Sequence, residues 1–123
     1  MFLKYSYVAA TIIFTVYGQL IIKWRMSLKG ELPEDFLPKI GFILSAYTDI
    51  WIISGFIAAF MASMSWAAAM TKFELSHAYP FMSLSFVLVF LLSIYLFNEA
   101  FSWAKFLGTL LIVLGVIISV QKF

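Results

Sequence analysis

The chain has 123 residues, of which 64% are apolar and 11% charged, and its mean hydropathy is +1.03. A soluble domain is typically about 45–50% apolar and about 25% charged, and a small one cannot hide so much apolar surface from water. The net charge of +2 is too small and too scattered for nucleic acid, and the lack of cysteine excludes disulfides and cysteine-based metal sites. We therefore predict an all-α membrane protein.

Four apolar segments are long enough to cross a membrane as helices, because a span needs about 20 mainly apolar residues. An open chain in lipid can satisfy its backbone only as a helix. We place these spans at about 5–22, 50–70, 78–97 and 103–120. The first span, with Lys4 before it, could be mistaken for a secretory signal peptide. No small-residue cleavage pattern comes after the span, so we expect the span to be retained. Residues 1–123 are then a single multi-pass transmembrane domain, a four-helix bundle with antiparallel neighbours.

The one long connection, between the first two spans, predicts a helix that lies at the membrane surface. From about 36 to 47, apolar residues recur at steps of three and four with polar residues between them, as in an amphipathic helix. Asp35 is placed to cap the start of this helix. An apolar loop packed against the bundle is the alternative.

The basic residues favour one orientation only slightly. Four spans put both termini on one side, with Lys4, Lys72 and Lys122, against five basic residues on the other side. Because positive charge accumulates in cytoplasmic loops, this division gives a weak bias toward external termini.

Small residues on two spans indicate close helix crossings. The second span carries Gly55, Ala59, Ser63 and Ala67 at four-residue spacing, with Ser54, Ala58 and Ala62 alongside. We interpret these small residues as packing within the bundle. The fourth span carries Gly108 and Gly115, seven residues apart and so on one face. Glycine weakens a helix, so such a pair favours a close crossing, but the spacing leaves open whether the crossing lies inside one protomer or between two.

The first span carries a polar seam, defined as Thr11, Thr15, Gln19 and Lys23, each four residues after the last. Polar residues in a span normally face the bundle interior or a water-filled cavity. The amide of Gln19 needs several partners in hydrocarbon, so we predict a functional role for Gln19 together with Lys23. The alternative is that Lys23 only extends to the lipid headgroups.

The start of the third span reads Ser76-His77-Ala78-Tyr79-Pro80. We expect Ser76 to be the N-cap and Pro80 to be tolerated close to the first turn. His77 is interpreted as a residue at headgroup level rather than as part of an anion site.

Two further residues, Tyr79 and Ser83, lie one turn apart and continue a polar edge into the third span. Glu99 follows that span and either pairs with Lys105 or is solvated. The sequence shows no nucleophile–base pair, metal-ligand cluster or glycine-rich phosphate loop, so we expect no enzyme activity, metal or cofactor. A polar seam with a basic mouth suits an amphiphile with an anionic head and an apolar tail.

The layout of four short spans resembles the small multidrug resistance fold of the drug/metabolite transporter (EamA-like) superfamily. The stretch 5–23, YSYVAATIIFTVYGQLIIK, is similar to the first helix of that family, and Gly108 with Gly115 is similar to its dimerisation motif. The resemblance implies a functional dimer with these glycines in the contact. Drug exporters of the family carry a glutamate in the first helix, where this chain has Thr15, so proton-coupled cation export is not expected.

The chain resembles most closely the flippase subunits for aminoarabinose-phosphoundecaprenol. The resemblance rests on Gly18-Gln19-Leu20 with Lys23, on AYPFMSLSFV at 78–87, and on Glu99 and Gly108. It implies a flippase, or a flippase subunit, for an undecaprenyl-phosphate-linked sugar in the bacterial inner membrane, serving cell-envelope or lipopolysaccharide modification. The implied partner is a second copy or a paralogous subunit. The alternatives are a small-molecule exporter and a non-transporting assembly subunit of a membrane glycosyltransferase.

On this reading, Lys23 pairs with the lipid phosphate as a compact positive charge. The other implied substrate contacts replace water around the head group. Together the implied substrate-binding residues are Thr15, Gln19, Lys23, Tyr79, Ser83 and Glu99.

Overall fold

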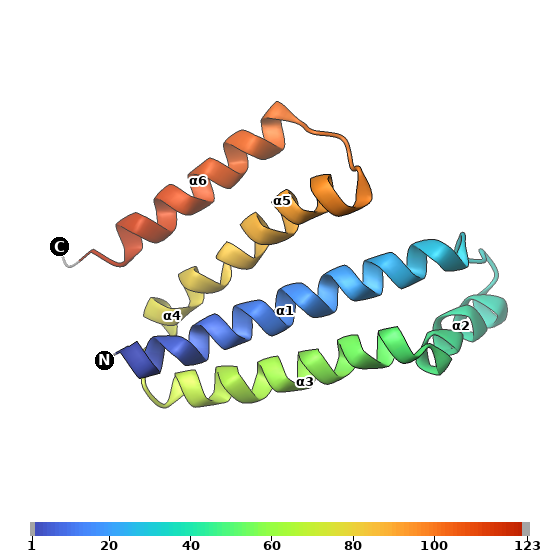
Figure 1. Cartoon of the computed structure of the whole chain (residues 1–123), viewed down its shortest axis with the longest axis horizontal. Helices are drawn as coiled ribbons and strands as arrows, with labels where there is room; N and C mark the ends of the chain where they lie inside the picture. Colours follow the sequence, from blue (N-terminus) through green and yellow to red (C-terminus); the bar gives the residue numbers. More distant parts are fainter. Residues whose placement is uncertain (1, 122–123) are drawn as a thin grey trace.

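The computed structural model describes residues 2–121, over which the chain is helical and contains no strand; Met1, Lys122 and Phe123 lie outside the described residues. The elements are α1 (Phe2–Lys29), α2 (Phe36–Ser45), the short 3₁₀ helix η1 (Ala46–Thr48), α3 (Ile50–Met70), α4 (Leu75–Met82), α5 (Leu84–Phe97) and α6 (Trp103–Ser119). In Figure 1, α1 and α3 lie side by side, α4 and α5 follow each other along α1, and α6 forms the outer edge. The described ends of the chain lie at one end of the bundle, and α2 lies at the other.

Three helical segments are long and apolar enough to cross a membrane: Leu3–Lys29, Ile50–Met70 and Leu75–Phe97. These correspond to the first three predicted spans. The fourth segment forms as the apolar helix α6, but its 17 residues make it shorter than the others. The all-helical class is therefore confirmed, while four crossings stay a prediction.

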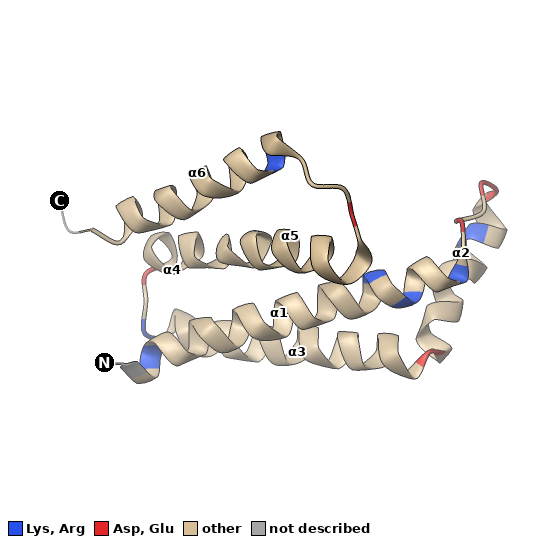
Figure 2. Ribbon diagram, turned by 45° about the horizontal axis from the view of Figure 1, so that its top comes forward, with Lys and Arg blue, Asp and Glu red and all other residues tan. Residues whose placement is uncertain are grey.

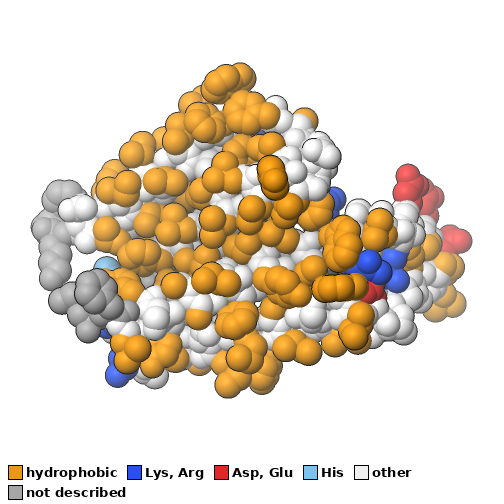
Figure 3. Space-filling model, viewed as in Figure 1, with side chains coloured by type: hydrophobic (Ala, Val, Ile, Leu, Met, Phe, Trp, Pro, Cys, Tyr) orange, Lys and Arg blue, Asp and Glu red, His pale blue; other side chains and the backbone are white. Residues whose placement is uncertain are grey.

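Apolar side chains dominate the surface of the molecule. In the view of Figure 3 they cover most of one face, and Figure 2 shows the charged residues near the ends of the helices. Large residues such as Phe86 and Leu111 are 68% and 69% exposed. Water would not tolerate so much contiguous apolar surface, so the solvent of this surface is lipid.

Helix α1 continues beyond the predicted end at residue 22 and includes Lys23, Trp24 and Arg25. The prediction was wrong because basic residues leave the hydrocarbon region by extending their side chains, without ending the helix. The helix ends instead at Gly30, whose φ of 92° lies in the left-handed region that favours glycine.

The connection between α1 and α3 folds into α2 and η1, which confirms a helix in the predicted place. None of the α2 side chains is buried. Asp35 occupies the N-cap position, but its side chain accepts no capping hydrogen bond, contrary to expectation. The position of α2 at the end of the bundle suits the predicted location at the membrane surface, which stays a prediction (Figure 1).

The third predicted span is interrupted, so that α4 ends at Met82 and α5 begins at Leu84. The expected N-cap was wrong: Glu74 holds that position without a side-chain bond, and Ser76 lies inside the first turn. Pro80 is the sixth residue of α4, where it cannot donate a backbone hydrogen bond. The Ser83 N–H bonds the Pro80 carbonyl at 3.1 Å, a tight turn that produces the interruption.

Helices α1 and α3 form the tightest packing in the protein. A Cβ added to Gly18 would lie 3.1 Å from the Gly55 carbonyl oxygen, so the two backbones are in contact. The predicted packing inside the bundle is confirmed for Gly55 and for the neighbouring Ala58 and Ala62, but the row at four-residue spacing is wrong beyond Gly55. The buried members of α3 include Gly55, Ala58, Ala62 and Ala69, whereas Ala59, Ser63 and Ala67 are exposed. On a helix of 3.6 residues per turn, each four-residue step moves the side chain about 40° around the axis, so a row of such steps leaves the buried face. Residues spaced alternately by three and four stay on one face.

Candidate functional site

A cavity of about 510 Å³ lies between α1, α3 and the interrupted α4–α5 segment. Its wall combines hydroxyl groups with aromatic rings and other apolar residues, and none of the described residues that line it is charged. The hydroxyl-bearing residues are Thr11, Thr15, Ser63, Tyr79, Ser83 and Ser85, and the other aromatic residues are Trp66 and Phe86. The volume falls within the range of about 300–1,000 Å³ that is usual for small-molecule sites.

Most of the hydroxyls in this cavity donate to backbone carbonyls three or four residues earlier in the chain. Thr11 bonds the Tyr7 carbonyl at 2.8 Å, and Ser83 bonds the Pro80 carbonyl. Ser85 and Ser63 make equivalent bonds one turn back. Their oxygen lone pairs remain, so these groups can accept hydrogen bonds from a ligand.

Two hydroxyls differ from this pattern, because those of Thr15 and Tyr79 form no hydrogen bond to any residue between 2 and 121. Both can therefore donate to a ligand as well as accept from it. The Tyr79 ring is 64% exposed and stands edge-on to Trp66, with ring centroids 6.1 Å apart. These two rings supply flat apolar faces beside the donors.

The polar seam of the first span does not enter the cavity as a whole. Thr11 is buried and Thr15 half-buried in the cavity wall, but Gln19 and Lys23 are exposed and line no part of it. Four-residue steps carry a helical seam about 120° around the axis over twelve residues. The structure thus brings Thr15, Tyr79 and Ser83 together and leaves Gln19 and Lys23 outside.

Glu99 also lies outside the cavity, exposed in the connection between α5 and α6. It makes no salt bridge with Lys105 within the described part of the chain. Its place after α5 puts it at the same end of the bundle as Lys23, since Leu96 and Phe97 of α5 share a cavity with Trp24 of α1.

The two glycines of α6 have open space beside them in the described part of the protomer. A Cβ on either Gly108 or Gly115 would meet no described atom within 4 Å, and Gly115 is exposed. Neither glycine therefore mediates a close crossing within the described residues.

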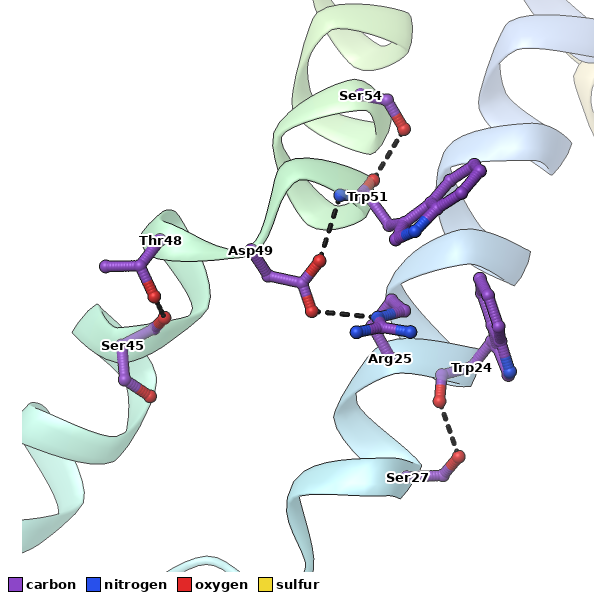
Figure 4. Close-up of polar contacts among 8 residues, drawn as sticks. All are labelled: Trp24, Arg25, Ser27, Ser45, Thr48, Asp49, Trp51 and Ser54. Atoms are coloured by element: carbon purple, nitrogen blue, oxygen red, sulfur yellow. Dashed lines mark hydrogen bonds and ion pairs between the residues drawn. The ribbon is translucent and has the colours of Figure 1, made fainter.

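An ion pair that was not predicted joins α1 to the start of α3, at the end of the bundle opposite the described chain ends. The Arg25 guanidinium donates to the Asp49 carboxylate at 2.8 Å, and the other carboxylate oxygen accepts from the backbone N–H of Trp51 at 2.9 Å (Figure 4). The hydrogen bond from Arg25, aided by that of Trp51, holds the pKa of Asp49 below its usual value of 3.8. Arg25 also lies 4.8 Å from the Trp24 ring, which stands edge-on to Trp51.

This pair was missed because the first helix was expected to end before Arg25. One signal was available: an aspartate directly before an apolar run is a typical N-cap. The aromatic lining residues Trp66 and Phe86 were also missed, since an aromatic residue in a span carries no sign of which way it faces.

The fold and the cavity define a helical membrane protein with a polar and aromatic site that can bind a ligand. The model of the EamA-like transporter family matches residues 1–121, and the chain belongs to this family. No solved structure matches the chain.

Several relatives carry one and the same name, probable 4-amino-4-deoxy-L-arabinose-phosphoundecaprenol flippase subunit ArnF. That of Proteus mirabilis is 34% identical over 96% of this chain and 92% of its own length. That of Pseudomonas fluorescens Pf0-1 is 33% identical over 88% of this chain and 80% of its own length. That of Pseudomonas aeruginosa is 37% identical over 81% of this chain and 72% of its own length.

Proposed function

We propose that this chain is a flippase subunit that moves a polyprenyl-phosphate-linked sugar across the bacterial inner membrane. The observation that carries the proposal is an open groove between the helices of a lipid-facing bundle, lined by hydroxyls and aromatic rings and by no charged residue among those described. The names of the relatives support this substrate class. The protein acts with four spans as a dimer, either with a second copy or with a paralogous subunit.

The cavity suits the sugar of such a lipid. Sugars carry hydroxyls that both donate and accept, and the cavity offers both functions at Thr15 and Tyr79 and acceptors at Ser83. The apolar faces of a sugar ring stack on aromatic side chains, which Trp66 and Tyr79 provide. The apolar tail needs no site of its own, because it stays in the surrounding lipid.

The phosphate is assigned to Lys23, outside the cavity. Thr15 and Lys23 are eight residues apart on α1, which separates them by about 12 Å along the helix axis. A sugar with its phosphate is nearly as long as this separation. Gln19 lies between them on the seam. Glu99, at the same end as Lys23, is the remaining proposed contact along the path of the head group.

The tight turn between α4 and α5 lies at this cavity, since Pro80 and Ser83 both line it. The Ser83 backbone keeps both hydrogen bonds, its N–H to Pro80 and its carbonyl to Phe86, so the turn offers the ligand side chains rather than free backbone groups.

The decisive experiment compares two kinds of transport by the purified protein, alone and with its paralogous partner, in liposomes. We expect flipping of a labelled polyprenyl-phosphate sugar and no proton-driven export of cationic drugs. The variant Thr15→Glu should lose most flipping without gaining drug export, because a carboxylate in this cavity repels an anionic head group. Proton-coupled cation export by the unmodified protein would overturn the proposal in favour of a small exporter. Co-purification with a glycosyltransferase and no flipping in any combination would instead identify an assembly subunit.

A further inference from the structure

A second cavity lies at the end of the bundle that holds the described chain ends, away from the proposed sugar site. It has a volume of about 480 Å³ and is lined by Leu3, Lys4 and Tyr7 of α1 and by Lys72 of the turn after α3. Two lysines from different elements thus face one space. Among residues 3–121, no acidic side chain lines this cavity.

The turn after α3 has a fixed backbone that sets the position of Lys72. The backbone N–H groups of Lys72 and Phe73 both bond the Ala69 carbonyl at 2.9 Å. Ala69 itself is fully buried against α1, so this turn is anchored to the core.

The ammonium group of Lys4 is positioned by an aromatic ring of the same turn. Its Nζ lies 5.3 Å from the centroid of the Phe73 ring. Phe73 in turn packs against Tyr5, with centroids 4.8 Å apart, and stacks on His77 at 5.5 Å. A cation–π contact of this kind leaves the N–H donors of the ammonium free for an anion.

The two positive charges are not neutralised within the described part of the chain. Neither Lys4 nor Lys72 forms a salt bridge with a described carboxylate. Glu74 is close to Lys72 in sequence, but it occupies the N-cap position of α4 and does not line the cavity. Two cations that pair with no described carboxylate, and that line one cavity, make a site for a group with several anionic oxygens.

We propose that this cavity binds the phosphate of an anionic membrane lipid. The apolar edge of the cavity favours a lipid over a water-soluble phosphate. Leu3, which lines the cavity, is 74% exposed and continues the apolar surface of α1. The acyl chains lie along that surface while the phosphate contacts both lysines. The lipid ties the first turn of α1 to the α3–α4 turn.

The test measures lipid binding and not transport, so its failure is distinct from failure of the flippase proposal. Full-length protein in a neutral detergent is titrated with phosphatidylglycerol, phosphatidylcholine or inorganic phosphate. Bound lipid is read by native mass spectrometry and stabilisation by the melting temperature. We expect saturable binding of phosphatidylglycerol with stabilisation, and much weaker effects of the other two. Equal effects of phosphatidylcholine would overturn the proposal, and equal effects of inorganic phosphate would overturn the assignment to a lipid.

Variants then locate the site. Lys4→Gln with Lys72→Gln should weaken phosphatidylglycerol binding by about fivefold per lysine, and Lys4→Arg with Lys72→Arg should retain most of it. The matched control is Lys29→Gln with Lys39→Gln, which removes the same charge at the opposite end of the bundle. Similar losses in the test pair and the control pair would mean that only total charge matters, and the site would be rejected.

Discussion

The backbones of Gly18 and Gly55 touch, since a Cβ on Gly18 would lie only 3.1 Å from the Gly55 carbonyl oxygen. Gly18→Ala should therefore destabilise the protein by about 1–3 kcal/mol through overpacking, offset by up to about 1 kcal/mol of helix propensity. Gly55→Ala should cost less, because its new Cβ meets the side chains of Ile21 and Ile22, which can shift. Equilibrium unfolding in a denaturing detergent measures both.

Gly41→Ala is the control for this pair, since a Cβ at that position in α2 meets nothing within 4 Å in the described chain. If the Gly18→Ala variant is as stable as the Gly41→Ala variant, α1 and α3 can move apart without a cost in free energy of unfolding. The order of stabilities, with Gly18→Ala lowest, is the informative result.

Gly115→Leu should separate the proposed dimer into protomers. Neither Gly108 nor Gly115 meets another described part of its own protomer, so a partner's helix can approach the backbone there. A leucine would hold the two backbones apart. Mass measurement in detergent should give the mass of one protomer for the variant and of two for the wild type. A variant that remains dimeric and active would remove the glycines from the interface.

Lys23→Ala should reduce flipping by about tenfold or more, because a charge-assisted contact to the lipid phosphate is lost. Lys23→Arg should retain part of the rate, since its charge remains but its shape and hydration differ. The measurement is flipping of a labelled polyprenyl-phosphate sugar in liposomes at matched protein levels. Lys29→Ala, at the end of the same helix, is the control and should behave as wild type. If all four proteins flip equally fast, Lys23 serves only to anchor α1 at the headgroups, and Gln19 becomes the next residue to test.

The Arg25–Asp49 pair should make stability depend on acid pH. The pKa of Asp49 is lower in the folded protein than its usual value of 3.8, mainly because Arg25 donates to the carboxylate. A lowered folded-state pKa adds stability above pH 3.8, and this contribution is lost as the pH falls through the folded-state value. We therefore expect the melting temperature to decrease as the pH is lowered below about 4.

Asp49→Asn should lower the melting temperature at neutral pH and flatten its acid dependence. Asp35→Asn is the matched control, because Asp35 also stands before a helix but its side chain accepts no capping bond. An unchanged acid slope in Asp49→Asn would show that other groups produce the pH dependence.

Length, apolar runs and charge placement were sufficient to predict the helical class and most helix bounds. The span at 50–70 matches α3 because Asp49 and the turn after Met70 mark both ends in the sequence. The interruption at Ser83 was not predicted, because the effect of Pro80 depends on where its helix begins. A proline is tolerated in the first turn of a helix and disrupts the helix further along. Ser76 appeared to be that beginning, and the helix in fact starts at Leu75.

The sequence by itself determined that lipid is the solvent, that the chain is helical, and that Thr15, Tyr79 and Ser83 are polar positions within the spans. Only the tertiary structure decided which of them share a space, because a four-residue seam drifts around a helix and α1 packs against α3, α4 and α5. It also decided that Arg25 meets Asp49 across a long connection. Such pairings depend on how helices pack against one another. The spacing of residues along the sequence reveals the period of a helix, but it does not reveal which helices become its neighbours.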